Sequence, residues 1–296
     1  MTEPLHMPSS TLADASYDYQ RRWATVRRIL PRPVRRALRL GYLLMLDGAD
    51  LCLGRNKDLV PPRWLNPIGD GDFEGTGEEF LNYFIRFGGL QPTHDILDVG
   101  CGIGRMARPF TKYLTTGTYE GFDIVPTGIR WCQKHFTPRF PAFQFTFADI
   151  RNPEYNPNGT VTAAQYRFPY PDSHFDFAFL TSVFTHMLPQ DVNHYLSELR
   201  RVFKPMGKCL ATFFILNRES RQFMASGKSS LNFQYDLPGC WTTNPELPEA
   251  AIGYEEQVLT SLLHANGLAL DSIHYGRWCG RNDYLSYQDV VVIKNL

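Results

Sequence analysis

Short apolar runs alternate with helical patterns over most of the chain beyond residue 75. In the helical patterns apolar residues recur every three or four positions, whereas the short runs are rich in β-branched and aromatic residues. Strands that alternate with helices are joined by right-handed crossovers, so the pattern predicts a mainly parallel sheet of seven strands. The expected helices cover residues 105–114, 127–135 and 191–203, and the expected strands cover residues 95–99, 119–124, 143–150, 175–181, 208–216, 268–275 and 287–294.

The link between the last two apolar runs, residues 276–286, is too short for a helical crossover. The final strand is therefore expected to run antiparallel to its neighbours. Two other segments break the alternation, because residues 151–171 are rich in proline and residues 218–253 are rich in aromatic residues, proline and glycine. We expect both to be loops or lids over a site at the carboxyl ends of the strands, with 218–253 as a substrate lid insertion.

Composition adds limits on partners and compartment. The chain has 296 residues, with 30 Lys and Arg against 30 Asp and Glu, so no global field favours a nucleic-acid partner. The six cysteines are scattered without a Cys-x-x-Cys pair, which favours reduced thiols and gives no signal for structural zinc. The first ten residues lack a secretory pattern, and the apolar stretch 40–53 is too short to span a bilayer. A cytoplasmic protein, at most peripheral to a membrane, is expected.

Residues 1–75 differ from the rest in being rich in arginine, proline and apolar helix formers, which indicates an N-terminal helical extension or cap before a catalytic domain at 76–296. Residues 21–39 hold eight arginines and no acid, and an apolar stretch follows. Residues 21–53 are therefore a candidate for contact with anionic lipid. The alternative is a cap whose arginines face solvent or acids elsewhere, since Pro31 and Pro33 would interrupt a long amphipathic helix.

A glycine-rich turn follows the first expected strand directly. The run from Asp95 reads DILDVGCGIG and is followed by a helix that starts near Arg105. Glycines at 100, 102 and 104 let the backbone bend and approach a ligand without a side-chain clash. A dinucleotide fingerprint needs a third glycine where Arg105 stands, so the turn suits a ligand without a diphosphate.

Acidic residues end the next two expected strands. Asp123 lies 19 positions beyond Gly104 (123 − 104) and can accept hydrogen bonds from both hydroxyls of a ribose. Asp149 follows the third strand and can accept from an adenine amino group. Each feature has a simpler explanation, because Asp98 and Asp149 could cap a helix or a turn. Their occurrence at consecutive strand ends favours an adenosine site.

Together these motifs resemble the class I S-adenosylmethionine-dependent methyltransferases with a compact methyltransferase domain. The resemblance covers roughly residues 76–216 and rests on residues 97–104, 121–123, 148–149, 168–176, 182–187 and 199–207, with Met206 where the family often has a glycine-like turn residue. It implies an α/β, Rossmann-like fold, in agreement with the antiparallel last strand, the N-terminal helical cap and the lid insertion expected above. It also implies an S-adenosylmethionine pocket with Asp98, Gly100, Cys101, Gly102 and Gly104 near the methionine moiety, Asp123 on the ribose, and Asp149 and Ile150 around the adenine, with Ile124 as a further cofactor-binding residue.

The acceptor side is less defined. His186 follows the fourth strand and is the candidate general base for an alcohol acceptor, with positioning or packing as the alternative role. The aromatic residues Phe233, Tyr235 and Trp241 are candidates for lining a substrate pocket, although core packing under a lid would give the same composition. No carboxylate and histidine cluster has metal-ligand spacing, so a metal-free mechanism is expected.

The expected reaction moves a methyl group to a small-molecule acceptor, a hydroxyl oxygen on a sugar, lipid-linked or natural-product scaffold. The motif typical of amide- and base-modifying relatives is absent after the fourth strand, where residues 181–184 read TSVF. N-methylation of a small molecule and a non-catalytic, cofactor-binding regulatory protein remain alternatives. A nicotinamide-dependent oxidoreductase is disfavoured by Arg105. The oligomeric state stays open.

Overall fold

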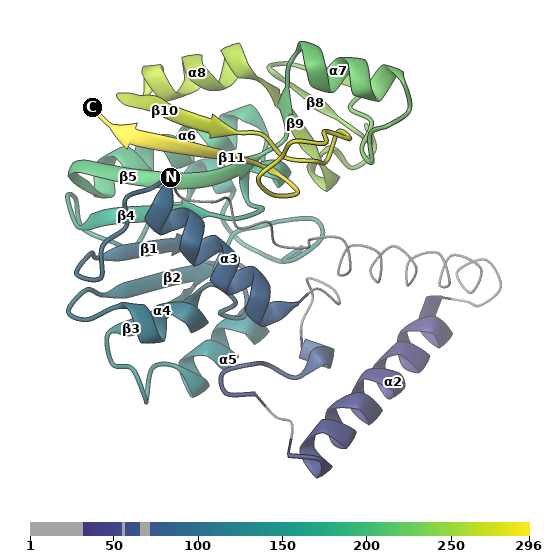
Figure 1. The fold of residues 1–296 in the computed structure, drawn as a ribbon, viewed down its shortest axis with the longest axis vertical. Helices are drawn as coiled ribbons and strands as arrows, with labels where there is room; N and C mark the ends of the chain where they lie inside the picture. The colour runs from purple at the N-terminus through teal and green to yellow at the C-terminus, as the bar shows by residue number, and fades with distance from the viewer. Residues whose placement is uncertain (1–31, 55–56, 66–71) are drawn as a thin grey trace, which may run out of the picture. The chain divides into compact units, whose positions relative to one another are not determined.

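The structure is a computed structural model that describes residues 32–54, 57–65 and 72–296. Two compact units divide the chain, Met1–Glu79 and Phe80–Leu296. The second unit holds a seven-stranded sheet in the order β10-β11-β5-β4-β1-β2-β3 (Figure 1). Its strands are β1 Ile96–Val99, β2 Tyr119–Asp123, β3 Phe143–Phe147, β4 Phe175–Leu180, β5 Phe203–Phe213, β10 Leu268–His274 and β11 Asp289–Asn295.

The strand directions confirm the expected sheet. β1 pairs in parallel with β2 and β4, and β11 pairs antiparallel with both β5 and β10. All four residues of β1 are buried, as expected for a parallel strand covered on both faces. The order reverses at β1 and β4, so the carboxyl ends of these neighbouring strands form the switch point where ligands bind in such sheets.

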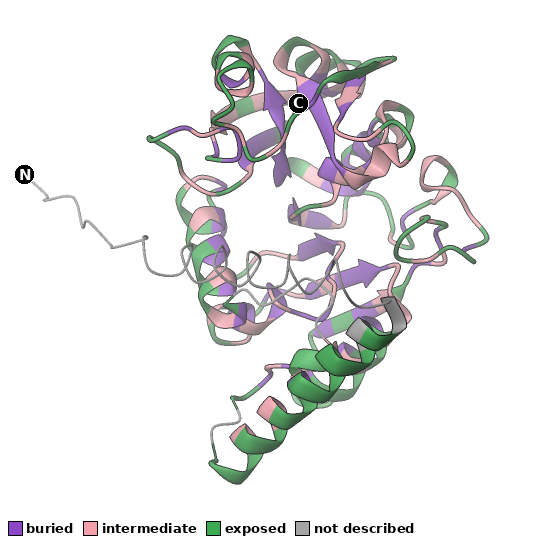
Figure 2. Cartoon of the chain, turned by 90° about the vertical axis from the view of Figure 1, so that its right-hand side faces the viewer, coloured by how far each residue is buried: buried purple, intermediate pink, exposed green. Residues whose placement is uncertain are grey.

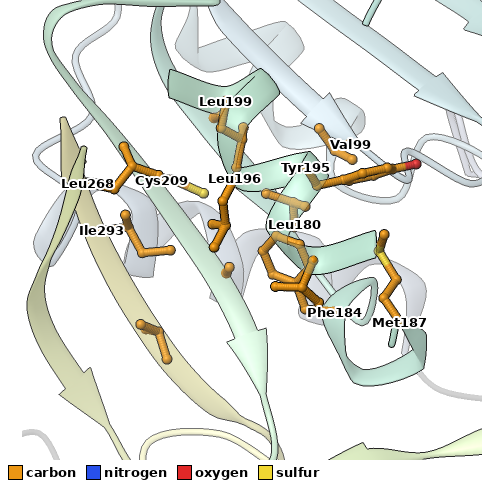
Figure 3. Close-up of a cluster of buried hydrophobic side chains, with 14 of the residues drawn as sticks. Val99, Leu180, Phe184, Met187, Tyr195, Leu196, Leu199, Cys209, Leu268 and Ile293 are labelled. Carbon is orange, nitrogen blue, oxygen red and sulfur yellow. The ribbon is translucent and has the colours of Figure 1, made fainter. Parts of the chain in front are cut away.

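Helices occupy the crossovers of the second unit. They are α4 Ala107–Tyr113, α5 Pro126–His135, α6 Pro189–Val202 and α8 Glu256–Ala265, and α3 Phe73–Arg86 lies before β1. α5 packs on β2 and β3, whereas α6 packs on α8 and on the short helix η2 Ala163–Gln165. The main apolar cluster lies between α6 and the sheet, with Leu196 and Leu199 of α6 facing Cys209 and Ile293 (Figure 3).

The segment 218–253 is not a loop, which corrects the expectation. It contains α7 Arg218–Ala225, β7 Tyr235–Leu237, β8 Cys240–Thr242, η4 Pro248–Ala250 and the start of β9 Ile252–Glu255. With β6 Ile215–Leu216 these strands form a second sheet in the order β6-β9-β8-β7. Asn217 begins α7 through two reciprocal bonds: its Oδ1 accepts from the Ser220 amide at 3.0 Å, and the Ser220 hydroxyl oxygen accepts from the Asn217 amide at 2.9 Å.

The first unit contains one long helix, α2 Arg32–Cys52, and a short helix η1 Arg63–Leu65. The expectation that proline would interrupt a long helix here is wrong, because Pro33 is the second residue of α2, where the missing amide hydrogen costs nothing. The first four arginines of the basic run, Arg21 to Arg28, lie outside the described residues. Among the residues that are described, no helix has the length and apolar character needed to cross a membrane.

Candidate active site at the carboxyl ends of β1, β2 and β4

The glycine turn after β1 is fixed by its backbone conformation. Gly100, Gly102 and Gly104 have φ values of 82°, 56° and 80°, in the left-handed region that side chains disfavour. The amides of Gly100 and Cys101 both donate to the Phe122 carbonyl of β2, at 2.9 and 3.1 Å. The turn is therefore anchored to the neighbouring strand.

Close packing on two sides leaves no room for larger residues around this turn. A Cβ atom at Gly100 would lie 2.5 Å from Cγ2 of Val183, in the segment after β4. A Cβ atom at Gly128, in the first turn of α5, would lie 2.5 Å from the Gly102 carbonyl oxygen. Glycine at these positions brings the end of β4 and the start of α5 against the turn, so the three segments form one edge of the site.

Asp123 is the last residue of β2 and lies beside the turn. Its Oδ2 accepts from the Gly102 amide at 2.8 Å and its Oδ1 from the Val125 amide at 2.7 Å. Burial raises the pKa of this carboxyl, and the bonds from these amides work against that rise. A carboxylate accepts about four hydrogen bonds, so the Asp123 carboxylate retains capacity for a ribose hydroxyl.

Asp98 is fully buried near the end of β1. The Tyr119 hydroxyl donates to its Oδ2, whereas Oδ1 is buried and has no hydrogen-bond partner among the described residues. Burial raises the pKa of Asp98 to about 8, because the charged form loses its hydration. The residue does not cap α4, whose N-cap is Met106 without a side-chain bond. An unpartnered carboxyl oxygen beside the glycine turn fits a ligand that carries an ammonium group.

Asp149 and Ile150 follow β3. Oδ2 of Asp149 accepts from the Thr160 hydroxyl at 2.6 Å, and its carbonyl accepts from the Thr160 and Val161 amides. Ile150 is buried in the main cluster, and Ile124 after β2 packs partly buried against the same cluster. The segment 151–161 thus folds back on the end of β3, close to Asp149.

His186 ends a short helix, η3 Phe184–His186, after β4. Its Nδ1 lies 2.8 Å from the carbonyl oxygen of Glu249, in η4. A carbonyl oxygen only accepts hydrogen bonds, so Nδ1 carries the proton in the neutral ring. This tautomer leaves Nε2 as a proton acceptor and ties the end of β4 to the second sheet.

The three aromatic candidates for substrate contact have different surroundings. Phe233 is buried, with ring centroids 5.4 Å from Phe214 and 5.3 Å from Trp278. Trp241 is partly buried against this same cluster, and the Arg221 guanidinium lies 4.5 Å from the centroid of its ring. Tyr235, on β7, is exposed. The rings do not form one wall, and their contact with a substrate stays a prediction.

A buried polar network near this edge of the sheet escaped the sequence interpretation. Asp289, the first residue of β11, accepts from the Ile215 amide at 2.6 Å, the Gly276 amide at 2.7 Å and the Trp278 indole at 2.7 Å. Burial raises its pKa to about 6, against these bonds and the charge of Arg281. In the sequence the network consists of isolated polar residues between the last two strands, so no spacing signal could have revealed it.

Comparison with known proteins indicates a methyltransferase domain. Residues 97–211 match the model of a family described as a methyltransferase domain. The phthiotriol/phenolphthiotriol dimycocerosates methyltransferase of Mycobacterium tuberculosis H37Rv is 29% identical over 185 residues, which cover 58% of this chain and 58% of the relative. The fatty-acid O-methyltransferase of Mycolicibacterium smegmatis is 30% identical over 118 residues, or 40% of this chain and 36% of the relative.

The chain thus spans less than two thirds of the length of these relatives. Among solved structures, the PH0226 protein of Pyrococcus horikoshii OT3 is similar over 78% of this chain and 94% of its own, with a TM-score of 0.53 and 15% identity, a likeness of fold. Residues 97–211 therefore match a methyltransferase domain, and the seven-stranded sheet with its antiparallel β11 is the fold of the class I S-adenosylmethionine-dependent methyltransferases, whose cofactor is S-adenosylmethionine.

Proposed function

We propose that this chain transfers a methyl group from S-adenosylmethionine to a hydroxyl oxygen of a small-molecule acceptor, and that the acceptor is a lipid or lipid-linked alcohol. The two relatives above support the lipid nature of the acceptor, because their names specify a dimycocerosate and a fatty acid as substrates. The observation that carries the oxygen chemistry is the bond between Nδ1 of His186 and the Glu249 carbonyl, which leaves Nε2 able to accept a proton.

The cofactor is assigned to the groups around the glycine turn. Asp123 accepts from the ribose hydroxyls while the Gly102 amide holds its carboxylate in position. Asp98 pairs its unpartnered Oδ1 with the ammonium of the methionine moiety, and a nearby cation lowers the pKa that burial has raised. Asp149 accepts from the adenine amino group. When bound, S-adenosylmethionine supplies a methyl carbon on a positively charged sulfur.

The acceptor side needs alignment and removal of one proton. Nε2 of His186 would take the hydroxyl proton, and bound S-adenosylmethionine would supply the methyl group to the acceptor oxygen, with S-adenosylhomocysteine as the second product. General base catalysis of this kind contributes roughly 100-fold or more to turnover. The rest of the acceleration comes from holding oxygen, carbon and sulfur in line and from excluding water.

The test separates a proton acceptor from a positioning residue. His186→Asn keeps a side-chain donor for the Glu249 carbonyl but has no basic nitrogen, whereas His186→Ala removes both. His194→Asn is the matched control, because the His194 ring on α6 also bonds a carbonyl, that of Tyr166 at 2.9 Å. Methyl transfer is measured by mass spectrometry on a panel of long-chain alcohols, hydroxylated lipids and glycolipids.

If His186 is the base, both His186 variants lose roughly 100-fold in turnover while cofactor affinity and the His194 control stay unchanged. Full activity of His186→Asn would assign the residue to positioning. Cofactor binding without turnover on any acceptor, amines included, would instead favour a regulatory protein.

A further inference from the structure

The long helix α2 separates charged from uncharged positions. On a helical wheel drawn at 100° per residue, Leu40 and Tyr42 bound a sector of about 200° that contains no charged residue. All its arginines and both its acids fall in the remaining sector. Such segregation is the pattern of a helix that lies at a boundary between an apolar and an aqueous phase.

The uncharged sector faces outward. Its large apolar side chains are between 42% and 66% exposed, and α2 is coloured as exposed along most of its length in Figure 2. By contrast Leu43, in the charged sector, is only 7% exposed, and α2 packs against η1. The helix therefore packs against its own unit through the charged sector and leaves the apolar side exposed to solvent. The exposed residues of this apolar face are Val34, Leu38, Leu40, Tyr42, Leu44, Met45 and Leu51.

The charges of the opposite side suit an anionic surface. Asp47 and Asp50, the two acids of α2, are both paired with Arg63, at 2.9 and 2.6 Å. The remaining charges of the helix are four arginines in its first two turns, and four more arginines precede them between residues 21 and 28. Basic residues close to an anionic leaflet are attracted to its surface.

The width of the apolar face argues for lipid over a second helix. A two-helix seam uses a narrow stripe, so pairing with another copy would leave much of the 200° sector in water. Trp64, in η1 next to Arg63, is 50% exposed, and tryptophan is enriched at membrane interfaces. The helix is not apolar enough to cross a bilayer, which leaves an orientation parallel to the surface.

We propose that α2 binds the surface of an anionic membrane, with the apolar face of Leu38 and Met45 buried among the acyl chains and the arginines at the level of the headgroups. This inference goes beyond the proposed function and does not depend on it. If the acceptor is lipid-linked, the helix also brings the enzyme to the phase that holds its substrate.

Vesicle flotation of the full chain tests the proposal. The probes are vesicles of phosphatidylcholine alone and of an equal mixture with phosphatidylglycerol, each at about 0.1 M and about 0.5 M salt. We expect binding to the mixed vesicles that weakens with salt. Leu38→Glu with Met45→Glu weakens it at least 10-fold, whereas Leu38→Phe with Met45→Phe retains it. Met206→Glu is the matched control, because Met206 is a highly exposed methionine in the second unit.

Retained binding of S-adenosylhomocysteine shows that the variants are folded, and no acceptor is needed, so a failure of the proposed function leaves this test intact. Absence of wild-type binding to the mixed vesicles, or equal binding by the double glutamate variant, would overturn the proposal. Light scattering measures the oligomeric state and so tests the alternative occupant of the apolar face, a second copy of the chain. A change from dimer to monomer in the glutamate variant, with vesicle binding unchanged, would assign the face to a second copy of the chain.

Discussion

Replacing Asp98 by asparagine tests the consequences of a carboxyl group buried at the end of β1. Asparagine has the same shape and keeps an oxygen that accepts from the Tyr119 hydroxyl, but it cannot ionise. In the wild type, burial raises the pKa of Asp98 from 3.8 to about 8. The folded, ligand-free chain therefore holds this proton at neutral pH, whereas the unfolded chain releases it.

The size of the effect follows from that proton. Between pH 3.8 and about pH 8 the folded state binds one more proton at Asp98 than the unfolded state. The free energy of unfolding therefore falls as the pH rises, by about 1.4 kcal/mol per pH unit. From about pH 6 to about pH 7.5 this amounts to roughly 2 kcal/mol. The asparagine variant lacks this contribution, so its stability relative to the wild type rises by the same amount.

Urea unfolding of both proteins without cofactor, at about pH 6 and about pH 7.5, measures this difference. Asp236→Asn removes the same charge at an exposed position of β7 and serves as the control. A difference between wild type and Asp98→Asn that does not change with pH would refute the reasoning, since it would mean that Asp98 is ionised in the folded chain. Release of a proton when S-adenosylhomocysteine binds to the wild type would further support the ammonium assignment.

Three further substitutions test the packing around the site. Asp289→Ala leaves the Ile215 and Gly276 amides and the Trp278 indole buried without their acceptor, and we expect a loss of about 3–5 kcal/mol in the free energy of unfolding. Gly128→Ala places a methyl group against the Gly102 carbonyl, so we expect about 1–3 kcal/mol lower stability and weaker cofactor binding, measured by urea unfolding and calorimetry. Met206→Gly relieves a φ of 67° at an exposed position, and we expect a gain of about 0.5 kcal/mol in urea unfolding.

The parallel sheet could be predicted from the sequence because its strands are continuous apolar runs separated by helical patterns. β1, β2 and β4 each begin within a residue of the expected position. β5 begins at Phe203, whereas the sequence predicts a start at residue 208. The earlier start was missed because residues 203–207 include lysine, proline and glycine, which are depleted in strands. Met206 within it takes the left-handed conformation that a family glycine would adopt.

The second sheet could not be predicted, for a different physical reason. β7 and β8 have three residues each, too few to show an alternation of apolar and polar side chains. The proline and glycine between them predict a loop. In the structure Gly239 forms the tight turn of a hairpin that joins the two strands. Strand pairing across such short segments is decided by tertiary contacts with β9 and not by local propensity.

In the site, the residues of the glycine turn were predictable because φ values above zero demand glycine, and Asp123 was predictable from its place at a strand end. The contact between His186 and Glu249 was not, because 63 residues separate the two and a backbone carbonyl leaves no mark in the sequence. The same holds for Arg281 and Asp289, whose charges look like surface residues until the fold buries them.

The central claim is that S-adenosylmethionine binds at the glycine turn with its ribose on Asp123. Titration calorimetry of S-adenosylhomocysteine with the wild type, Asp123→Ala and the exposed control Asp236→Ala tests it most directly. We expect binding to the wild type and the control, and affinity weaker by about 1.5–3 kcal/mol, roughly 10- to 150-fold, for Asp123→Ala, because charge-assisted hydrogen bonds to ribose are lost. Equal affinity of a folded Asp123→Ala variant would contradict it.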